Sequence, residues 1–199
     1  MRLLFTIILG LNFSIGFSQT ISNWTPDYEL TLADFQSPQT EINEELTNYS
    51  IFLGTNMNFD FHMSAYQFVF TKNFNSKVKV TLNKGASVIT APNLSSAQYL
   101  IKYGQYNFDL TELYARKFRK EMYLQKGAFS DISFFQPIFK KIQEEMNAEN
   151  TRVFKATEMG KKEQLLKEEH EKILLEINTL SDFCLECKPP KKKKKKKKK

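Results

Sequence analysis

Residues 97–120 read AQYLIKYGQYNFDLTELYARKFRK, and this stretch decides the fold class of the chain. Apolar side chains recur here three and four positions apart, which is the spacing of one face of an α-helix. Ser95 or Ser96 can cap the start of the helix, and Gly127 can end it. The pattern predicts one long helix whose apolar stripe consists of Leu100, Ile101, Leu110, Leu113, Tyr114, Phe118 and Met122.

Two further helices are predicted after the long one. Residues 133–147 carry an apolar stripe at helical spacing, and so do residues 158–180. In the last helix we expect the pairs Glu163/Lys167 and Glu168/Lys172 to lie on the exposed face. The side chains that we expect to face inward there are Leu166, Ile173, Ile177 and Leu180.

The chain before about residue 90 alternates apolar and polar residues, which is typical of half-buried strands. We expect the strand KVKVTL, residues 77–82, to pair in an antiparallel hairpin with residues 66–70 across the polar break at 72–76. Further strands are expected at residues 28–32 and 49–53. Strands followed by helices predict an α+β fold, with an N-terminal antiparallel sheet followed by about three helices.

The N-terminus has the pattern of a secretory signal peptide. An apolar run extends from Leu3 to Leu11, and the small residues Gly16 and Ser18 precede Gln19. We therefore expect residues 1–18 to be a signal peptide cleaved after about Ser18, which predicts a periplasmic or secreted protein. An uncleaved anchor or a buried helix is also compatible with the run, although it is short for a bilayer.

The net charge of +7 is misleading, because Lys191 to Lys199 alone contribute nine positive charges. Without them the charge is −2, so the composition does not indicate a nucleic-acid partner, whose basic footprint lies on a face or a helix. We expect residues 19–183 to form the folded domain and residues 184–199 to form a disordered lysine-rich tail. The tail is either an anchor for anionic lipid or polysaccharide, or an artefact of a repetitive coding tract.

The chain contains two cysteines, Cys184 and Cys187. A disulfide between them would close so short a loop that it would add little stability. A zinc knuckle needs two more ligands at matching spacing, and a thioredoxin-like motif begins a helix, whereas this pair follows one.

Residues 97–120 also resemble the central helix of a bacterial family, domain of unknown function 922, whose members are described as predicted secreted zinc-dependent proteases. Phe108-Asp109 and the run ELYARKFRK, residues 112–120, carry the likeness. Trp24 with LTLADF, residues 30–35, is similar to the opening strand of the family. Ser87-Val88 and ATEMG, residues 156–160, are similar to later elements. The resemblance covers roughly residues 21–180 and implies a zincin-like arrangement.

The same resemblance places the zinc motif of the family on residues that cannot bind zinc well. Tyr103 and Asn107 stand where the family has the two histidines of His-Glu-x-x-His, Gly104 stands at the glutamate, and Met159 stands at a third histidine. Phenol, carboxamide and thioether groups are poor ligands for Zn²⁺. We therefore expect no catalytic residue and no cofactor. Gly104 also weakens the helix by about 1 kcal/mol relative to Ala, which relaxed selection on an unused site would explain.

The sequence also allows a metal site with other ligands. Carboxylates such as Asp109, Glu112 and Glu158 are candidates for a rebuilt metal site. The histidines His62 and His170 lack ligand spacing. We expect His170 to pack at a seam between helices.

The aromatic side chains of the long helix have two interpretations. Tyr99, Tyr103, Tyr106 and Phe108 either form a platform for sugar or peptide or, as is commoner at helical spacing, belong to the core. The binding candidates are Tyr99, Tyr103, Tyr106, Asn107 and Glu112. Four cationic residues further along are interpreted as a solvated helix face: Arg116, Lys117, Arg119 and Lys120.

The sequence thus predicts an exported, catalytically inactive relative of a secreted zinc-dependent protease that acts as a binding or structural domain. The alternative is an active secreted hydrolase with a rebuilt metal site. The expected partner is a protein, peptide or glycan outside the cytoplasm. Membrane contact is expected only if the tail, Lys191 to Lys199, is natural.

Overall fold

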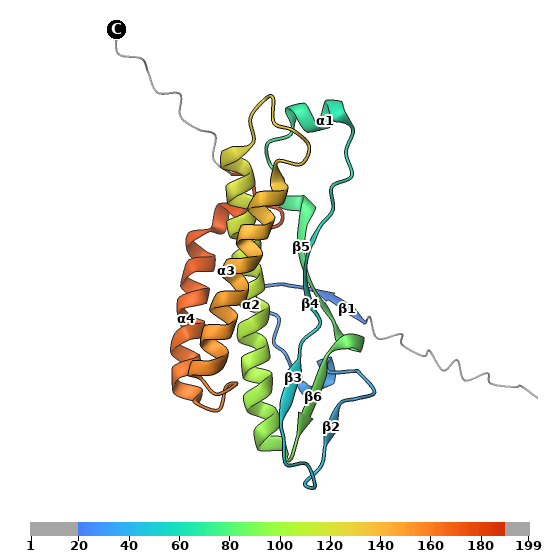
Figure 1. Cartoon of the computed structure of the whole chain (residues 1–199), viewed down its shortest axis with the longest axis vertical. Helices are drawn as coiled ribbons and strands as arrows, with labels where there is room; N and C mark the ends of the chain where they lie inside the picture. The colour runs from blue at the N-terminus through green and yellow to red at the C-terminus, as the bar shows by residue number, and fades with distance from the viewer. Residues whose placement is uncertain (1–19, 190–199) are drawn as a thin grey trace, which may run out of the picture.

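The computed structural model describes residues 20–189. The predicted signal peptide, residues 1–18, and the lysine run, residues 191–199, lie outside the described residues. Within them, strands precede three long helices, which confirms the α+β class (Figure 1). No helix among residues 20–189 is long and apolar enough to cross a membrane.

The strands form two small sheets of three strands each. The first has the order β1-β5-β4 and is antiparallel throughout. The second has the order β2-β6-β3, in which β6 pairs parallel with β2 and antiparallel with β3. The strands are β1 (Ile21–Asn23), β2 (Glu41–Ile42), β3 (Ser50–Phe52), β4 (Thr55–Phe59), β5 (Val78–Asn83) and β6 (Val88–Ala91).

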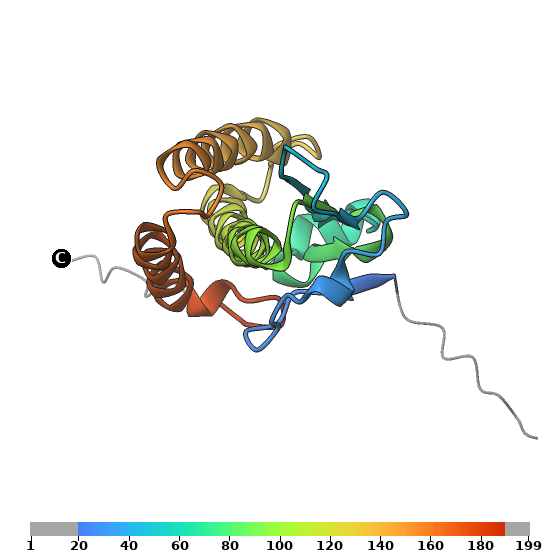
Figure 2. The ribbon, with the colours of Figure 1, turned by 90° about the horizontal axis from the view of Figure 1, so that it is seen from below.

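The helices form a layer against these sheets. The short helix α1 (Ala65–Phe70) precedes the three long ones, α2 (Leu94–Gln125), α3 (Phe135–Ala156) and α4 (Glu163–Thr179). Helix α2 lies between the sheets on one side and the pair α3 and α4 on the other (Figure 2). It is therefore buried on several faces, and most of its second half is core.

The predicted apolar stripes form this core. In α2 the side chains of Leu100, Leu110, Leu113, Phe118 and Met122 are at most 1% exposed. Leu166, Ile173, Ile177 and Leu180 are also buried, as predicted for the last helix. The residues of the two predicted pairs are exposed, as expected. The predicted pairing is wrong, because Glu163 pairs with Lys102, Lys167 with Glu171 and Lys172 with Glu169.

The predicted strand at residues 66–70 is wrong, because these residues form α1. Ser64 caps that helix: its hydroxyl accepts from the amide of Gln67 at 3.2 Å, and the Gln67 side chain accepts from the amide of Ser64 at 2.9 Å. This reciprocal capping box favours a helix over a strand. The hairpin partner of β5 is instead β4. The alternation suited a strand, but of Tyr66, Phe68 and Phe70 only Phe68 is buried.

The strand predicted at residues 28–32 is also absent from the described structure. Its end runs into a 3₁₀ turn, Leu32–Asp34. The Asp34 carboxylate accepts hydrogen bonds from the backbone amide of Thr31 at 2.8 Å and from the hydroxyl of Tyr28 at 2.8 Å. These bonds turn the chain before a strand can form. The strand predicted at residues 49–53 is confirmed as β3.

The ends of the helices differ from the prediction in two places. Asn93, rather than Ser95 or Ser96, caps α2, since its side chain accepts from the amide of Ser96 at 2.9 Å. The last helix, α4, begins at Glu163, not near residue 158 as predicted. Residues 158–160 instead form a left-handed turn after α3, with φ angles of 51°, 57° and 92°.

The boundary expected at residue 183 falls too early. Cys184 and Cys187 form a disulfide, and the carbonyl of Cys187 accepts from the side-chain amides of Asn73 and Asn75 at 3.1 and 2.9 Å. The segment after the 3₁₀ turn η4 (Ser181–Phe183) is thus fastened to the body of the domain. It is not part of a disordered tail.

Candidate functional site

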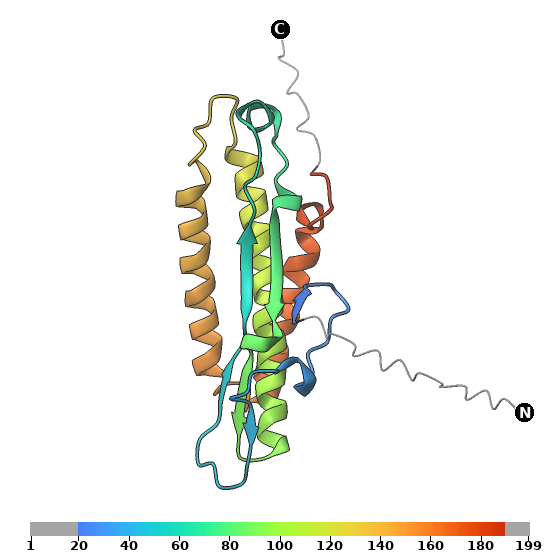
Figure 3. The same cartoon turned by 90° about the vertical axis from the view of Figure 1, so that its right-hand side faces the viewer.

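A groove of about 410 Å³ lies between α2, α3 and the β3–β4 segment. This volume is within the range of small ligand sites. One face of α2 forms its floor, α3 forms one wall and the strand segment forms the other. Figure 3 shows β4 on the side of its sheet that faces α3. The lining residues are Ile51, Phe52, Leu53, Thr55, Asn56, Met57, Tyr103, Gly104, Asn107, Leu110, Thr111, Gln143, Met146, Asn147, Asn150 and Phe154.

The wall formed by β4 is a sheet edge. Among the described residues, β5 is the only strand that pairs with β4. The amide of Asp60 donates to the carbonyl of Lys77 at 2.8 Å, which marks a hydrogen-bonded pair of the ladder. Because such pairs alternate in antiparallel sheets, the peptide groups of Met57 and Phe59 point away from β5. They are placed to pair with a further extended chain.

The lining is rich in carboxamides and poor in charge. Asn56 and Asn107 face the groove with Gln143, Asn147 and Asn150 of α3. None of the lining residues is Asp, Glu, His, Cys, Lys or Arg. The groove therefore offers hydrogen-bond donors and acceptors, but no side chain that gains or loses a proton readily near neutral pH.

Tyr103 is the one phenol in the groove lining. Its hydroxyl donates to Oδ1 of Asn150 at 2.5 Å. Burial raises the pKa of Tyr103 to about 12, although a side-chain hydrogen bond from Asn107 acts in the opposite direction. The phenol therefore stays protonated at neutral pH and joins α2 to α3.

Gly104 of α2 faces side chains of the N-terminal half of the domain, Ile51 and Leu30 among them. A Cβ atom at this position would lie 3.2 Å from Cδ1 of Ile51 and 3.4 Å from Cδ1 of Leu30. The contact with Ile51 is tighter than usual, so its side chain would have to shift by a few tenths of an ångström. The absence of a side chain at Gly104 thus has a packing reason, which the expectation of relaxed selection did not include.

The structure brings together only some of the positions singled out in the sequence. Tyr103, Gly104 and Asn107 share the groove floor, whereas Met159 lies outside its lining, in the left-handed turn. Among residues 20–189, no group of three His, Cys, Asp or Glu side chains is arranged to hold a metal ion. A protonated phenol and carboxamides do not fit zinc, so we derive no step through that metal.

The remaining binding candidates lie elsewhere. Tyr106 and Phe108 are fully buried, and Tyr103 is only 5% exposed, so these three of the four aromatic residues belong to the core. Burial also raises the pKa of Tyr106. Tyr99 is half-buried near the start of α2, where its hydroxyl accepts from Ser95.

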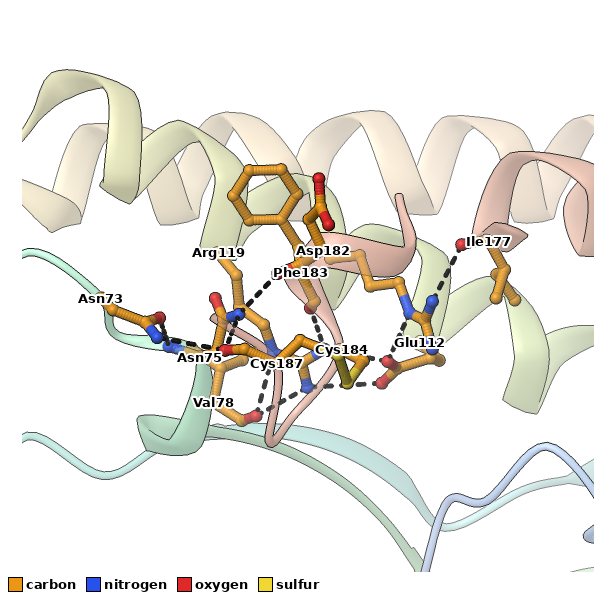
Figure 4. The surroundings of a disulfide bond; sticks show 11 residues. Asn73, Asn75, Val78, Glu112, Arg119, Ile177, Asp182, Phe183, Cys184 and Cys187 are labelled. Carbon is orange, nitrogen blue, oxygen red and sulfur yellow. Dashed lines mark hydrogen bonds and ion pairs between the residues drawn. A yellow bond between two sulfur atoms is a disulfide. The ribbon is translucent and has the colours of Figure 1, made fainter. Parts of the chain in front are cut away.

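Glu112 is buried in a cluster of charges that the sequence did not reveal (Figure 4). Its carboxylate accepts from Arg116 at 2.9 Å and from Arg119 at 2.8 Å. Arg119 also donates to the carbonyl of Val78 at 2.7 Å and to that of Phe183 at 3.0 Å. The cluster therefore ties α2 to β5 and to the C-terminal segment.

The predicted solvated face is consequently wrong for Arg116 and Arg119. Their side chains are 6% and 1% exposed. Charged groups are buried when their hydrogen bonds are satisfied, and here backbone carbonyls complete the guanidinium contacts. Lys117, by contrast, lies partly exposed beside Glu176.

Asp109 belongs to a second buried network. It accepts from Nε1 of Trp24 at 2.7 Å and from Gln105 at 3.0 Å, and it lies 2.7 Å from Nε2 of His170. His170 thus packs at the seam of α2 and α4, as predicted. Glu158 is exposed beside Lys162. The carboxylates proposed for a rebuilt metal site therefore do not meet.

No protein-family model, no curated protein and no solved structure matches this chain. The candidate site therefore rests on its own geometry. Sequence reasoning found the half of the groove that α2 provides. It missed the half that α3 and β4 provide, whose side chains carry no motif.

Proposed function

We propose that this protein is an exported binding domain, a catalytically inactive relative of secreted zinc-dependent proteases, and that its groove holds an extended polypeptide segment. The proposal rests on one observation: the free edge of β4 and the carboxamide side chains of α3 line opposite walls of a groove of about 410 Å³.

An extended peptide suits both walls. Peptide groups of β4 that point away from β5 can pair with a ligand strand, as in other cases of strand addition to a sheet edge. The carboxamides of Gln143, Asn147 and Asn150 on the opposite wall can donate to and accept from the other edge of the same ligand. Apolar side chains such as Leu53 and Met146 lie between these polar groups and can receive ligand side chains.

The groove lacks the groups that peptide hydrolysis needs. General acid–base catalysis requires a side chain whose pKa lies near the working pH. The lining has no such residue, and burial raises the pKa of Tyr103 to about 12. Thr111 does not act as an activated nucleophile, since its hydroxyl donates to the carbonyl of Asn107 at 2.9 Å.

The likeness to the zinc-protease family supports the same proposal. Two residues that carry the likeness, Trp24 and Asp109, are joined by a hydrogen bond of 2.7 Å although they lie 85 positions apart. Such a bond would hold the opening segment against the central helix. A zincin-like ancestry would also account for a groove that runs beside that helix and includes Tyr103 and Asn107, two of the three positions aligned with zinc ligands.

Selection from a random peptide library on the purified protein tests peptide binding. Asn147→Trp places a large ring in the groove, whereas Ala148→Trp, its exposed neighbour on α3, lies outside the lining. We expect selected peptides to bind the wild type and Ala148→Trp equally. Asn147→Trp should bind at least about tenfold more weakly, which corresponds to about 1.4 kcal/mol. Equal binding to all three proteins would place the ligand elsewhere.

The loss of catalysis has its own test. Added zinc should leave the melting temperature unchanged, and the selected peptides should remain intact after long incubation with or without metal. Cleavage that a chelator abolishes would instead support the alternative, an active hydrolase with a rebuilt metal site.

A further inference from the structure

A cluster of exposed apolar side chains occupies one end of the long axis of the molecule. It comes from α1 and from the loop that joins α2 to α3, and both lie at the same end in Figures 1 and 3. We call this cluster the aromatic tip. Its members are Tyr66, Val69, Phe70, Phe129 and Ile132, and their exposed fractions run from 48% to 102%.

The two segments of the tip are packed together. The Phe68 ring of α1 lies 5.9 Å from the ring of Phe134 at the end of the loop, and Nζ of Lys126 lies 4.2 Å from the centre of the Phe68 ring. The buried side chains of the two segments thus pack against each other. The residues of the aromatic tip lie on the opposite, exposed side of the segments. Elsewhere, large exposed apolar residues such as Phe52 and Leu175 lie on separate elements.

The described residues of this end carry little net surface charge, because exposed Lys72 is offset by Asp131, and Lys126 is buried with its ammonium donating to the carbonyl of Gly127. Positive charge instead follows in the sequence, after residue 187. The carbonyl of Cys187 is bound by Asn73 and Asn75, a few residues after Phe70. The chain therefore leaves the body near the aromatic tip. Lys188 and the nine lysines of residues 191–199 follow this point in sequence.

From this arrangement we propose that the aromatic tip docks on an anionic lipid surface. Aromatic side chains favour the boundary between lipid headgroups and acyl chains. Clustered lysines add electrostatic attraction, and each strengthens binding to an anionic surface about fivefold. One apolar signal together with one basic signal is the combination that gives stable but reversible membrane attachment.

The same charge distribution argues against two other occupants. A second copy of the chain would bring two sets of lysines together, and like charges would repel. An acidic polysaccharide would attract the lysines but would leave the exposed rings of Phe70 and Phe129 without an apolar partner. An anionic lipid surface offers both negative charge for the lysines and an apolar phase for the rings.

A fluorescent reporter tests contact of the tip with lipid. Phe129 is fully exposed, so Phe129→Trp should fold as the wild type does. The full-length variant is mixed with vesicles of phosphatidylcholine with about one-third phosphatidylglycerol at about 0.15 M salt. We expect a blue shift of emission that the wild type, with Trp24 alone, does not show. An unchanged spectrum on vesicles that bind the protein overturns the proposal.

Sedimentation with the same vesicles separates the tip from the lysines. We expect Phe70→Ser/Phe129→Ser to weaken binding about tenfold or more while the lysines remain in place. The control Leu94→Ser/Leu175→Ser removes two exposed apolar residues that lie outside both the tip and the groove lining, and it should bind as the wild type does. The proposal fails if the tip variant binds as tightly as the control, or if the wild type does not bind anionic vesicles. Circular dichroism establishes that each variant is folded.

Discussion

The hydroxyl of Tyr103 donates a hydrogen bond of 2.5 Å to Oδ1 of Asn150, which joins α2 to α3 at the floor of the groove. The zinc-protease family that residues 97–120 resemble has a metal ligand at the position of Tyr103. In this protein the position instead carries a contact between helices. Tyr103 therefore both lines the groove and joins two helices of the domain. Substitutions of this residue should change the free energy of unfolding.

Removal of the Tyr103 hydroxyl should destabilise the domain slightly. Tyr103→Phe keeps the ring in place but leaves Oδ1 of Asn150 without its donor. A typical net contribution of such a bond is about 1 kcal/mol, which lowers the melting temperature of a domain of this size by about 2–4 °C. Differential scanning calorimetry measures the shift. Tyr66→Phe is the control, since Tyr66 is 76% exposed and should show no change.

The stability of the domain should also fall at alkaline pH because of Tyr103. Burial raises the pKa of this phenol from 10.0 to about 12, so folding favours the protonated form. This contribution is complete below about pH 10 and is lost as the pH rises through about 12. Urea unfolding at about pH 9 and about pH 11 should therefore show a smaller loss for Tyr103→Phe than for the wild type. Equal losses would show that Tyr103 does not contribute to the alkaline transition.

The long helices were predictable because burial of one face imposes a spacing of three and four residues. One of the two wrong strand predictions, at residues 66–70, could have been avoided from the sequence. Over the five residues 66–70, an alternating pattern fits a strand, and only Ser64 and Gln67, three positions apart, indicate a helix start. That signal was present in the sequence. A capping pair deserves more weight than alternation over so short a stretch.

The candidate site was only half predictable for a different reason. The positions Tyr103, Gly104 and Asn107 were predicted from the resemblance of one helix to a zinc-protease motif. The opposing groups, such as Asn150, reach the groove only because α3 packs beside α2, and no local pattern encodes that. The burial of Arg119 was hidden for the same reason, since its partners Val78 and Phe183 lie 41 and 64 positions away.

Glu112 should be among the costliest positions to neutralise. Glu112→Gln removes the negative charge that faces Arg116 and Arg119 and leaves two guanidinium groups in a buried site. Removal of one partner from a buried ion pair costs about 3–5 kcal/mol. Chemical denaturation should therefore show a large fall in the free energy of unfolding. Glu144→Gln breaks an exposed pair with Lys140 and should change it by less than about 1 kcal/mol.

The left-handed turn after α3 depends on Gly160. Its φ angle is 92°, which other residues rarely adopt, and a Cβ atom there would lie 2.5 Å from the carbonyl oxygen of Tyr99. Gly160→Ala must therefore shift the turn away from α2, and we expect a loss of about 2 kcal/mol or more. Gly85→Ala is the matched control, since its nearest contact would be 3.5 Å from an Asn83 side-chain oxygen. It should be neutral or stabilising by up to about 1 kcal/mol. Equal effects of the two substitutions in thermal unfolding would contradict the packing of this turn against Tyr99.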